Sequence, residues 1–368
     1  MKIALLGFGT VGSHFYKLCE GRSDLQITAV LSRRPRPELT CTVTADYDEI
    51  VRDPSIDIVV EVMGGIEPAY SYLCAAMRAG KHVVTANKQL MCARFDALTA
   101  LSKEMDVALR CTAAAGGGIP WLTSLSRASQ LDEITAVEGI LNGTTNYMLS
   151  AMTNSGADYA AALQKAQELG YAEADPTADV EGLDARRKLV LSADLAFGVN
   201  IKEEDIPCVG ISSITAADIA RAKEEGLTYK LIARAEKSGN AVAAFVCPTL
   251  FPSSAPEAHT DGTGNLATLY AARFGRQSFS GAGAGGYPTG SSVLRDCLDI
   301  ADGCRSFYAD SFVPRSVNLS GMQGKWLFRC MGEYFTRECS AREAFDAYES
   351  YRKDDPHALL ARYAAEEE

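Results

Sequence analysis

The first third of the chain alternates between short apolar runs and segments whose apolar residues recur with helical spacing. Continuous apolar runs are typical of strands that are buried on both faces, and apolar positions three and four residues apart are typical of helices. The runs that predict strands are KIALLG, LQITAVLS, IDIVVEVMG, KHVVTAN and VALRCTAAAGGG, and the helical segments are TVGSHFYKLCEG, AYSYLCAAMRAG and FDALTALSKEMD. This alternation predicts an α/β fold with a doubly wound parallel sheet over residues 1–125.

The pattern changes after residue 125. Residues 126–285 combine strand-like and helical segments without regular alternation, which predicts a second domain of the α+β class. Within it, YKLIARAEKSGNAVAAFVCPTLF predicts two antiparallel strands around Ser-Gly-Asn, and LDARRKLVLSADLAFG predicts a helix. We assign a helix at about residues 286–305 to the first domain. Residues 306–368 form a short tail with one strand-like piece, KWLFRC, and one helical piece rich in Ala, Glu and Arg.

Composition narrows the classes of partner. The chain has 368 residues, 47% of them hydrophobic, and a formal net charge of −11, which argues against nucleic acid or an anionic membrane as partner. No apolar run reaches the ~18 residues of a membrane-spanning helix. The N-terminal apolar stretch enters a glycine turn without a cleavage site, so we interpret it as a strand rather than a signal peptide. Eleven cysteines without a CxxC pair indicate reduced thiols and a cytoplasmic protein.

The first predicted strand is followed by GFGTVG, which comprises Gly7, Phe8, Gly9, Thr10, Val11 and Gly12. It fits the pattern G-x-G-x-x-G in the strand–turn–helix context that dinucleotide binding needs. Glycine permits the tight turn at position 7, the approach of backbone to a pyrophosphate at position 9, and close helix packing at position 12. The helix N-terminus offers N–H donors to the anion. The segment therefore predicts a Rossmann-type cofactor domain, with a ligand-free tight turn as the alternative.

The second predicted strand indicates which cofactor this domain prefers. NAD sites usually carry Asp or Glu about 20 residues after the glycines, where it binds the ribose 2′-hydroxyl. Here Ser32, Arg33 and Arg34 occupy that region. Because guanidinium groups bind phosphate, we predict a preference for NADP(H) over NAD(H). The alternative is that these arginines lie in a solvated loop of a protein that uses both cofactors.

Two lysines are candidates for chemistry. Asn87 and Lys88 follow the strand KHVVTAN, and ligands bind at the carboxyl ends of strands in such sheets. Asp184 and Lys188 lie four residues apart in a predicted helix, a spacing that permits an ion pair. A protonated lysine held in this way can donate to a carbonyl oxygen while hydride reaches the carbon.

The alternative for the second lysine is an ordinary surface pair worth a few tenths of a kcal/mol. Three more carboxylates lie just upstream of it, on Glu173, Asp175 and Asp179. Because the ammonium of an amino-acid substrate needs such carboxylates, the cluster favours a substrate site.

Six segments in this order resemble the homoserine dehydrogenase family over residues 1 to about 305. They are GFGTVG, GGIEPAYSYLCAAMRAGKHVVTANK, GGGIP, GILNGTTNYML, GYAEADPTADVEGLDARRK and GAGAGGYPTGSSVLRD. The resemblance implies the NAD(P)-dependent interconversion of L-homoserine and L-aspartate 4-semialdehyde, a step in threonine and methionine biosynthesis. It also implies a homodimer or higher homo-oligomer, formed through the sheet of the second domain.

The resemblance also implies roles for individual residues. The family's acid/base lysine falls on Lys188, and its cofactor- and substrate-contacting lysine falls on Lys88, beside Asn87. The substrate-binding carboxylates fall on Glu173, Asp179 and Asp184. The backbone that lines the cofactor falls on Gly170, Gly283 and Gly285.

One departure from the family concerns a monovalent cation, Na⁺ or K⁺, which the family commonly binds through a glutamate and three backbone carbonyls. Here the loop reads TAAAGGGIP, with Thr112 in the place of that glutamate. The carbonyls of Ala115, Gly117 and Ile119 remain as ligands. Because the charged ligand is missing, we predict a weak or absent cation site.

The second departure is the tail. Many relatives carry a regulatory ACT domain with a βαββαβ pattern, and residues 306–368 are too few for a complete one. We therefore predict no strong feedback by threonine. Two alternatives to the implied enzyme remain open: a catalytically silent NADP-binding sensor, and another amino-acid semialdehyde oxidoreductase on the same plan. An aldehyde-oxidising enzyme would need a nucleophilic cysteine, and no Cys/His pairing is evident.

Overall fold

A computed structural model of the chain describes residues 1–304, 308 and 312–365. The fold consists of two compact units, which are described here separately. Unit 1 comprises Met1–Gln130 and Ala282–Phe312, and unit 2 comprises Leu131–Gly281 and Val313–Glu368. Within the described part of the chain, no helix is long and apolar enough to cross a membrane.

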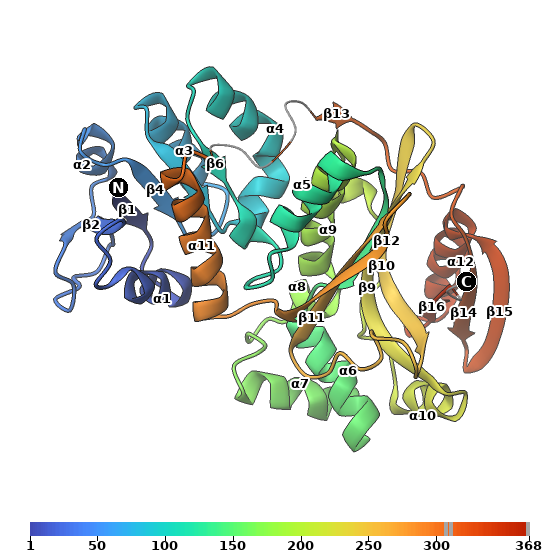
Figure 1. Ribbon diagram of the computed structural model, residues 1–368. Coiled ribbons are helices and arrows are strands. Elements are labelled where there is room, and N and C mark those ends of the chain that lie inside the picture. Colours follow the sequence, from blue (N-terminus) through green and yellow to red (C-terminus); the bar gives the residue numbers. More distant parts are fainter. Residues whose placement is uncertain (305–307, 309–311, 366–368) are drawn as a thin grey trace. The chain divides into compact units, whose positions relative to one another are not determined.

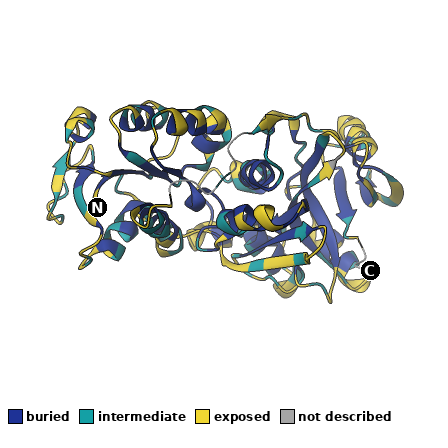
Figure 2. Cartoon of the chain, turned by 45° about the horizontal axis from the view of Figure 1, so that its top comes forward, coloured by how far each residue is buried: buried dark blue, intermediate teal, exposed yellow. Residues whose placement is uncertain are grey.

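Unit 1 is built on a six-stranded sheet with the order β3-β2-β1-β4-β5-β6, in which every neighbouring pair is parallel. Its strands are β1 (Lys2–Leu6), β2 (Gln26–Leu31), β3 (Thr42–Thr44), β4 (Ile58–Glu61), β5 (His82–Thr85) and β6 (Leu109–Arg110). All four residues of β4 are buried, as the apolar run predicted. Figure 2 shows the chain coloured by burial. The predicted doubly wound parallel sheet is confirmed.

The helices of unit 1 are α1 (Thr10–Cys19), α2 (Tyr47–Arg52), α3 (Ala69–Arg78), α4 (Lys88–Glu104), α5 (Trp121–Leu131) and α11 (Gly286–Ala301), with a short 3₁₀ turn, η1 (Thr112–Ala114). Helix α4 begins seven residues before the predicted segment, at Lys88. Strand β3 and helix α2 were not predicted, because the three residues of β3 are incompletely buried and give no apolar run. Helix α2 begins after Asp46, whose side chain accepts from the Asp48 N–H at 2.9 Å.

Unit 2 contains an eight-stranded mixed sheet with the order β12-β11-β7-β9-β10-β16-β14-β15. The strands are β7 (Ile134–Ile140), β9 (Leu227–Ser238), β10 (Ala241–Pro252), β11 (Gly264–Ala271), β12 (Gly275–Ala282), β14 (Gln323–Cys330), β15 (Glu333–Ser340) and β16 (Leu359–Tyr363). Strands β9 and β10 form the predicted antiparallel hairpin, whose register pairs Ser238 with Ala241. A separate pair joins β8 (Val199–Asn200) and β13 (Val313–Pro314) in parallel.

The helices of unit 2 are α6 (Gly143–Ser155), α7 (Tyr159–Glu168), α8 (Thr177–Val180), α9 (Leu183–Phe197), α10 (Ala216–Glu224) and α12 (Ala341–Asp354), with the 3₁₀ turn η2 (Glu203–Asp205). Helix α9, the predicted LDARRKL helix, packs against β7 and β9. Left-handed glycines flank it, Gly182 with φ 78° and Gly198 with φ 66°. A Cβ at Gly182 would lie 2.8 Å from the Cys208 sulfur, so glycine is also needed there for close packing.

The tail differs from its prediction of one strand and one helical piece. The first two residues of this tail, 306 and 307, lie outside the described residues. Strands β14, β15 and β16 together with α12 belong to unit 2 and extend its sheet (Figure 1). Strand β15 was not predicted because it lies at the sheet edge and several of its polar residues are exposed. Strand β16 was not predicted because it has only five residues. Trp326 and Phe328 form a buried cluster with Phe345 of α12.

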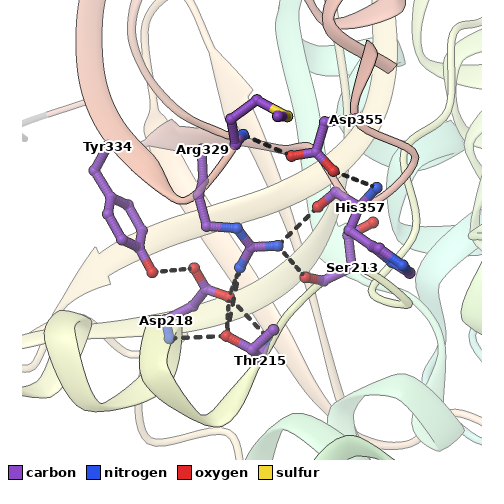
Figure 3. A network of polar contacts seen from close by, with 8 residues as sticks. Ser213, Thr215, Asp218, Arg329, Tyr334, Asp355 and His357 are labelled. Atoms are coloured by element: carbon purple, nitrogen blue, oxygen red, sulfur yellow. Dashed lines mark hydrogen bonds and ion pairs between the residues drawn. The ribbon is translucent and has the colours of Figure 1, made fainter. Parts of the chain in front are cut away.

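A buried polar network ties the C-terminal strands to α10 (Figure 3). The Arg329 guanidinium forms an ion pair with Asp218, and it donates to the carbonyls of Ser213 at 2.9 Å and His357 at 2.7 Å. The Tyr334 hydroxyl donates to the other oxygen of Asp218 at 2.8 Å. Asp218 also completes a capping box with Thr215 at the start of α10. One arginine thus joins segments more than 100 positions apart in the sequence.

Candidate active site

The turn between β1 and α1 has the conformation that its glycines predicted. Gly7 has φ 98°, a region that favours glycine, and a Cβ at Gly12 would lie 2.4 Å from the Gly7 carbonyl oxygen. A Cβ at Gly9 would meet nothing within 4 Å, so the backbone there faces open space at the N-terminus of α1. The turn is therefore sterically closed on the protein side at Gly12 and open at Gly9, the arrangement that a pyrophosphate needs.

A cavity of about 970 Å³ lies beside this turn. Its wall includes Gly7, Phe8 and Gly9 from the turn, Ser32, Arg33, Arg34 and Arg36 after β2, and Met63, Gly64 and Tyr72. No Asp or Glu is among the described residues that line it. The cavity therefore places both predicted arginines next to the glycine turn.

Arg36 is a further residue of this cavity that was not among the predicted site residues. Its guanidinium donates to the Phe8 carbonyl at 3.2 Å and lies over the Phe8 ring, 5.2 Å from the centroid. The Ser32 hydroxyl donates to the Arg34 carbonyl at 2.8 Å, which holds the loop after β2. The signal was present in LSRRPRPE, where a third arginine follows the first two at short range.

The loops at the ends of β4 and β5 are held by Glu61, which is fully buried and was also not predicted as a site residue. Its carboxylate accepts from the Thr85 hydroxyl at 2.6 Å and from the Met63 N–H at 2.7 Å. Asn87 donates to the Gly65 carbonyl at 2.6 Å and caps α4 by accepting from the Leu90 N–H at 3.0 Å. Both ends of the Asn87 amide thus bind protein groups, and this network fixes the start of α4, where Lys88 is the first, partly buried residue.

The predicted cation loop follows β6 and packs tightly. A Cβ at Gly117 would lie 2.4 Å from the Gly283 carbonyl carbon. The Gly117 carbonyl accepts from the Ser292 hydroxyl at 2.5 Å, and the Ile119 carbonyl accepts from the Trp121 N–H at 2.7 Å. Gly285, with φ 120°, caps α11 in the same glycine loop as Gly283. Two of the three proposed carbonyl ligands thus already accept protein hydrogen bonds.

Thr112, which stands in the place of the missing glutamate, is also bound to a protein group. The Thr112 N–H donates at 2.9 Å to Asp296, a fully buried carboxylate that pairs with the buried Arg110 at 3.1 Å. Burial raises the pKa of Asp296 to about 6, against the opposing charge of Arg110. Over the described ranges, no group of three His, Cys, Asp or Glu side chains could hold a metal ion.

In unit 2, the predicted pair on α9 is formed and buried. The Lys188 Nζ lies 2.8 Å from Asp184 Oδ2 and donates to the Leu141 carbonyl at 2.6 Å. Lys188 is 6% exposed and Asp184 is 5% exposed, so the interpretation as a solvated surface pair is wrong. A carboxylate at this distance stabilises the ammonium charge in a place that water does not screen.

Asn142 connects this pair to a second carboxylate. Its Nδ2 donates to Asp184 at 2.9 Å and to Asp179 at 2.7 Å, while its Oδ1 caps α6 by accepting from the Thr145 N–H at 2.9 Å. Asn142 was not named as a site residue. The available signal was its place in GILNGTTNYML, because Asn is a strong N-cap residue directly after a strand.

The Asp179 carboxyl has a raised pKa in this network. Burial raises the pKa of its carboxyl above the ordinary value, and the nearby charge of Asp184 acts in the same direction. The hydrogen bond from Asn142 opposes the shift without cancelling it. The structure thus brings together Asp179, Asp184 and Lys188 from the predicted set.

The rest of the acidic run lies apart from that network. The Glu173 side chain is exposed, and its backbone carbonyl accepts from Gln167 at 3.1 Å. Asp175 accepts from the Thr177 hydroxyl at 2.6 Å at the start of α8, which explains it as a local turn residue. Gly170 has φ 75° just after α7 and is exposed, which explains it as a helix-terminating glycine.

The chain matches known proteins over both units. Residues 7–111 match the family described as homoserine dehydrogenase, NAD binding domain, and residues 120–298 match the family described as homoserine dehydrogenase. The homoserine dehydrogenase of Bacillus subtilis is 39% identical over 83% of this chain and 74% of its own length. The chain belongs to the homoserine dehydrogenase family. The enzyme of this name from Corynebacterium glutamicum is 43% identical over 81% of this chain and 71% of its own length.

Solved structures agree with this assignment. The crystal structure of a homoserine dehydrogenase from Thiobacillus denitrificans has a TM-score of 0.90, with 27% identity, and the match covers 99% of this chain and 98% of that one. The chain is therefore an NAD(P)-dependent oxidoreductase of this family, with a nicotinamide cofactor domain in unit 1. A role in threonine and methionine biosynthesis follows from this enzymatic activity.

Proposed function

We propose that the chain reduces L-aspartate 4-semialdehyde to L-homoserine with NADPH, reversibly, and that Lys188 is the proton donor. The observation that carries this proposal is the Lys188–Asp184 pair, which is buried and oriented by two further groups, the Leu141 carbonyl and the Asn142 amide. A lysine fixed in this way is suited to proton transfer, because its ammonium points along defined hydrogen bonds.

The cavity in unit 1 fits a phosphorylated dinucleotide. The open backbone at Gly9 and the N–H groups of α1 would receive the pyrophosphate, and Arg33, Arg34 and Arg36 would receive a 2′-phosphate. A reduced nicotinamide, when bound, supplies the hydride. A preference of this cavity for NADP(H) is supported by its three arginines and by the absence of Asp and Glu from its described lining. The residues proposed to border the cofactor are Asn87, Lys88, Gly170, Gly283 and Gly285. Asn87 acts by fixing the loops, because both ends of its amide already bind protein groups.

Lys188 acts at the carbonyl oxygen of the substrate. During reduction its ammonium donates a proton to the developing alkoxide, and Asp184 compensates the charge at Nζ throughout. In the oxidative direction the neutral amine must accept the proton from the hydroxyl. We therefore expect oxidation of homoserine to favour alkaline pH.

The carboxylates of the acidic run receive the substrate's ammonium. Asp179 and Asp184 meet at the Asn142 amide, which donates to both. Glu173 is exposed six positions before Asp179, and we propose that it approaches the ammonium from the solvent side. Lys88 is proposed to contact the cofactor and substrate from unit 1. A monovalent cation is not expected to be required, because Thr112 offers no charge in the place of the usual glutamate. We also propose a homodimer through the sheet of unit 2.

The test is the rate of NADPH oxidation with L-aspartate 4-semialdehyde, with NADH in parallel. We expect faster turnover with NADPH and a loss of about 10²–10⁴ in kcat for Lys188→Ala, the usual contribution of general acid catalysis. Lys230→Met is the matched control, because Lys230 is a buried lysine of unit 2 that binds Asn146 at 3.1 Å and the Thr260 carbonyl at 2.7 Å, outside the network of Lys188. Equal losses in both variants would contradict the role of Lys188, and equal kcat/KM for NADH and NADPH would contradict the cofactor preference.

A further inference from the structure

A second cavity, of about 490 Å³, lies in unit 2 against strands β7, β9, β10, β11, β12 and β16. Its volume is in the range of small-molecule sites. Ile232, Phe251 and Ala255 give it an apolar wall. None of the residues that line it belongs to the network of Lys188, so the argument that follows does not depend on the proposed function.

Five charged residues line this cavity: Glu138, Arg234, Glu257, Arg276 and Arg362. Two of the arginines are neutralised. Arg234 pairs with Glu138 at 2.5 Å and with Glu236 at 3.0 Å, and Arg276 pairs with Glu257 at 2.5 Å. The Tyr270 hydroxyl adds a hydrogen bond to Glu138 at 2.6 Å.

Arg362 is the exception. It is 7% exposed, and its buried Nε has no hydrogen-bond acceptor among the described residues. The nearest compensation is the Phe245 ring, with the guanidinium carbon 5.8 Å from its centroid. Burial and the like charge of Arg234 lower the pKa of Arg362, and the charges of Glu138 and Glu236 oppose this shift without cancelling it. A buried guanidinium whose Nε lacks an acceptor is costly, so among the described residues the position favours a ligand that supplies an acceptor oxygen.

We propose that this cavity binds a small monocarboxylate with an apolar body, whose carboxylate pairs with the Arg362 guanidinium. Arginine presents a planar fork that matches a carboxylate with two hydrogen bonds. The apolar wall of Ile232 and Phe251 accommodates the body of the ligand. A phosphate dianion suits the site less well, because Glu138 and Glu257 line the same cavity and repel additional negative charge.

Calorimetric titration of the full chain with sodium benzoate tests this proposal. Benzamide has the same shape without the charge, and sodium chloride at equal ionic strength controls for screening. We expect benzoate to bind and benzamide and chloride not to bind. Arg362→Gln should weaken benzoate binding at least about tenfold, the loss of one charge-assisted hydrogen-bonded pair. Arg337→Gln is the matched control, an exposed arginine of β15 that lies 5.5 Å from the Phe335 ring, and it should bind benzoate as the wild type does.

Arg362→Lys keeps the charge and guards against a glutamine variant that fails to fold. It should retain binding, weakened by the loss of the two-pronged geometry. Three results would overturn the proposal: no benzoate binding to the wild type, binding of inorganic phosphate but not of benzoate, or equal binding by wild type and Arg362→Gln. Sedimentation velocity explains the first of these results: if benzoate does not bind and Arg362→Gln alters self-association, a second copy of the chain supplies the counter-charge instead.

Discussion

Two buried ion pairs of unit 2 share a plan and differ in what they connect. In each, a helix carries the carboxylate in its first turn, Asp184 in α9 and Asp218 in α10, where the helix dipole favours negative charge. The partner of Asp184 is Lys188, one turn along the same helix. The partner of Asp218 is Arg329, 111 positions away on β14.

The choice of cation fits each connection. Arg329 donates to side chains and carbonyls from several segments in fixed directions, and its guanidinium stays protonated at any pH the protein meets (Figure 3). The ion pair of Lys188 with Asp184 joins two residues of the same helix, and the Lys188 amine can give up a proton. Burial alone therefore does not identify a functional ion pair. The useful distinction is whether the pair bridges distant segments with a permanent charge, or holds a titratable group in place.

Removing the structural cation tests the first half of this comparison and should have the largest effect. Arg329→Ala leaves Asp218 buried without its counter-ion, and we expect the free energy of unfolding to fall by about 3–5 kcal/mol. Chemical denaturation measures this loss, and kcat per folded molecule should stay near the wild-type value. Arg337→Ala, on the neighbouring strand and exposed, should cost little. A large fall in kcat at temperatures where the variant is folded would break the comparison.

The second prediction exchanges the cation in the other pair. Lys188→Arg keeps a positive charge beside Asp184 but removes a side chain that can transfer a proton, so we expect kcat to fall by about 10²–10³. The free energy of unfolding should change much less than in Arg329→Ala, because the charge balance at Asp184 is retained. Steady-state rates and denaturation of the same preparations show whether Lys188 transfers a proton or only supplies a positive charge. Near-normal turnover with arginine would mean that Lys188 serves only as a fixed charge.

The sequence predicted one of these pairs and not the other, for a physical reason. Asp184 and Lys188 lie four residues apart in a helix, and helical geometry alone brings them together. Asp218 and Arg329 meet only through the pairing of β14 with β15 and β16, which local patterns do not specify. For the same reason Asn142 and Glu61 were not predicted as site residues, since their roles depend on which loops the sheets bring into contact.

Fold prediction had a similar limit. The parallel sheet of unit 1 was predictable because its strands are buried on both faces and read as apolar runs, as in β4. The exposed edge strand β15 carries no such signal. Arg36 was within a motif that was recognised, and only its contacts with Phe8 distinguish it from a solvated arginine.

A third prediction separates the two duties of Asn142, which caps α6 and also bridges the carboxylates beside Lys188. Asn142→Ser retains a good N-cap but loses the amide that donates to Asp179 and Asp184. We expect kcat/KM to fall by about tenfold, near the lower limit for a hydrogen bond to a charged group, with a change in unfolding free energy of only a few tenths of a kcal/mol. Asn142→Ala should add a stability loss of about 1 kcal/mol. If the serine and alanine variants lose kcat/KM and stability together, the bridge has no separate role.

The smallest expected effect is a pH dependence of stability, because the carboxyl groups concerned are partly or fully open to water, which screens them. The pKa of Asp179 is raised by burial and by Asp184, so the folded state holds its proton more tightly than the unfolded state does. Raising the pH through the interval between the unfolded and folded pKa values therefore removes stability that Asp179 contributes at lower pH. Asp179→Asn cannot titrate, and the stability of the wild type relative to this variant should fall as pH rises through that interval.

Asp175, four positions upstream, supplies a control of opposite sign. Hydrogen bonds from Thr177 lower the pKa of Asp175, so its contribution is present above the unfolded pKa and is lost as pH falls through the folded value. The stability of the wild type relative to Asp175→Asn should therefore rise with pH, as measured by chemical denaturation across the acidic range. Parallel slopes for the two variants would mean that Asp179 is ionised and paired in the folded state like an ordinary turn carboxylate. Asp179 would then be a structural carboxylate like Asp175, and Asp184 would be the first carboxylate of the run that belongs to the functional ion pair.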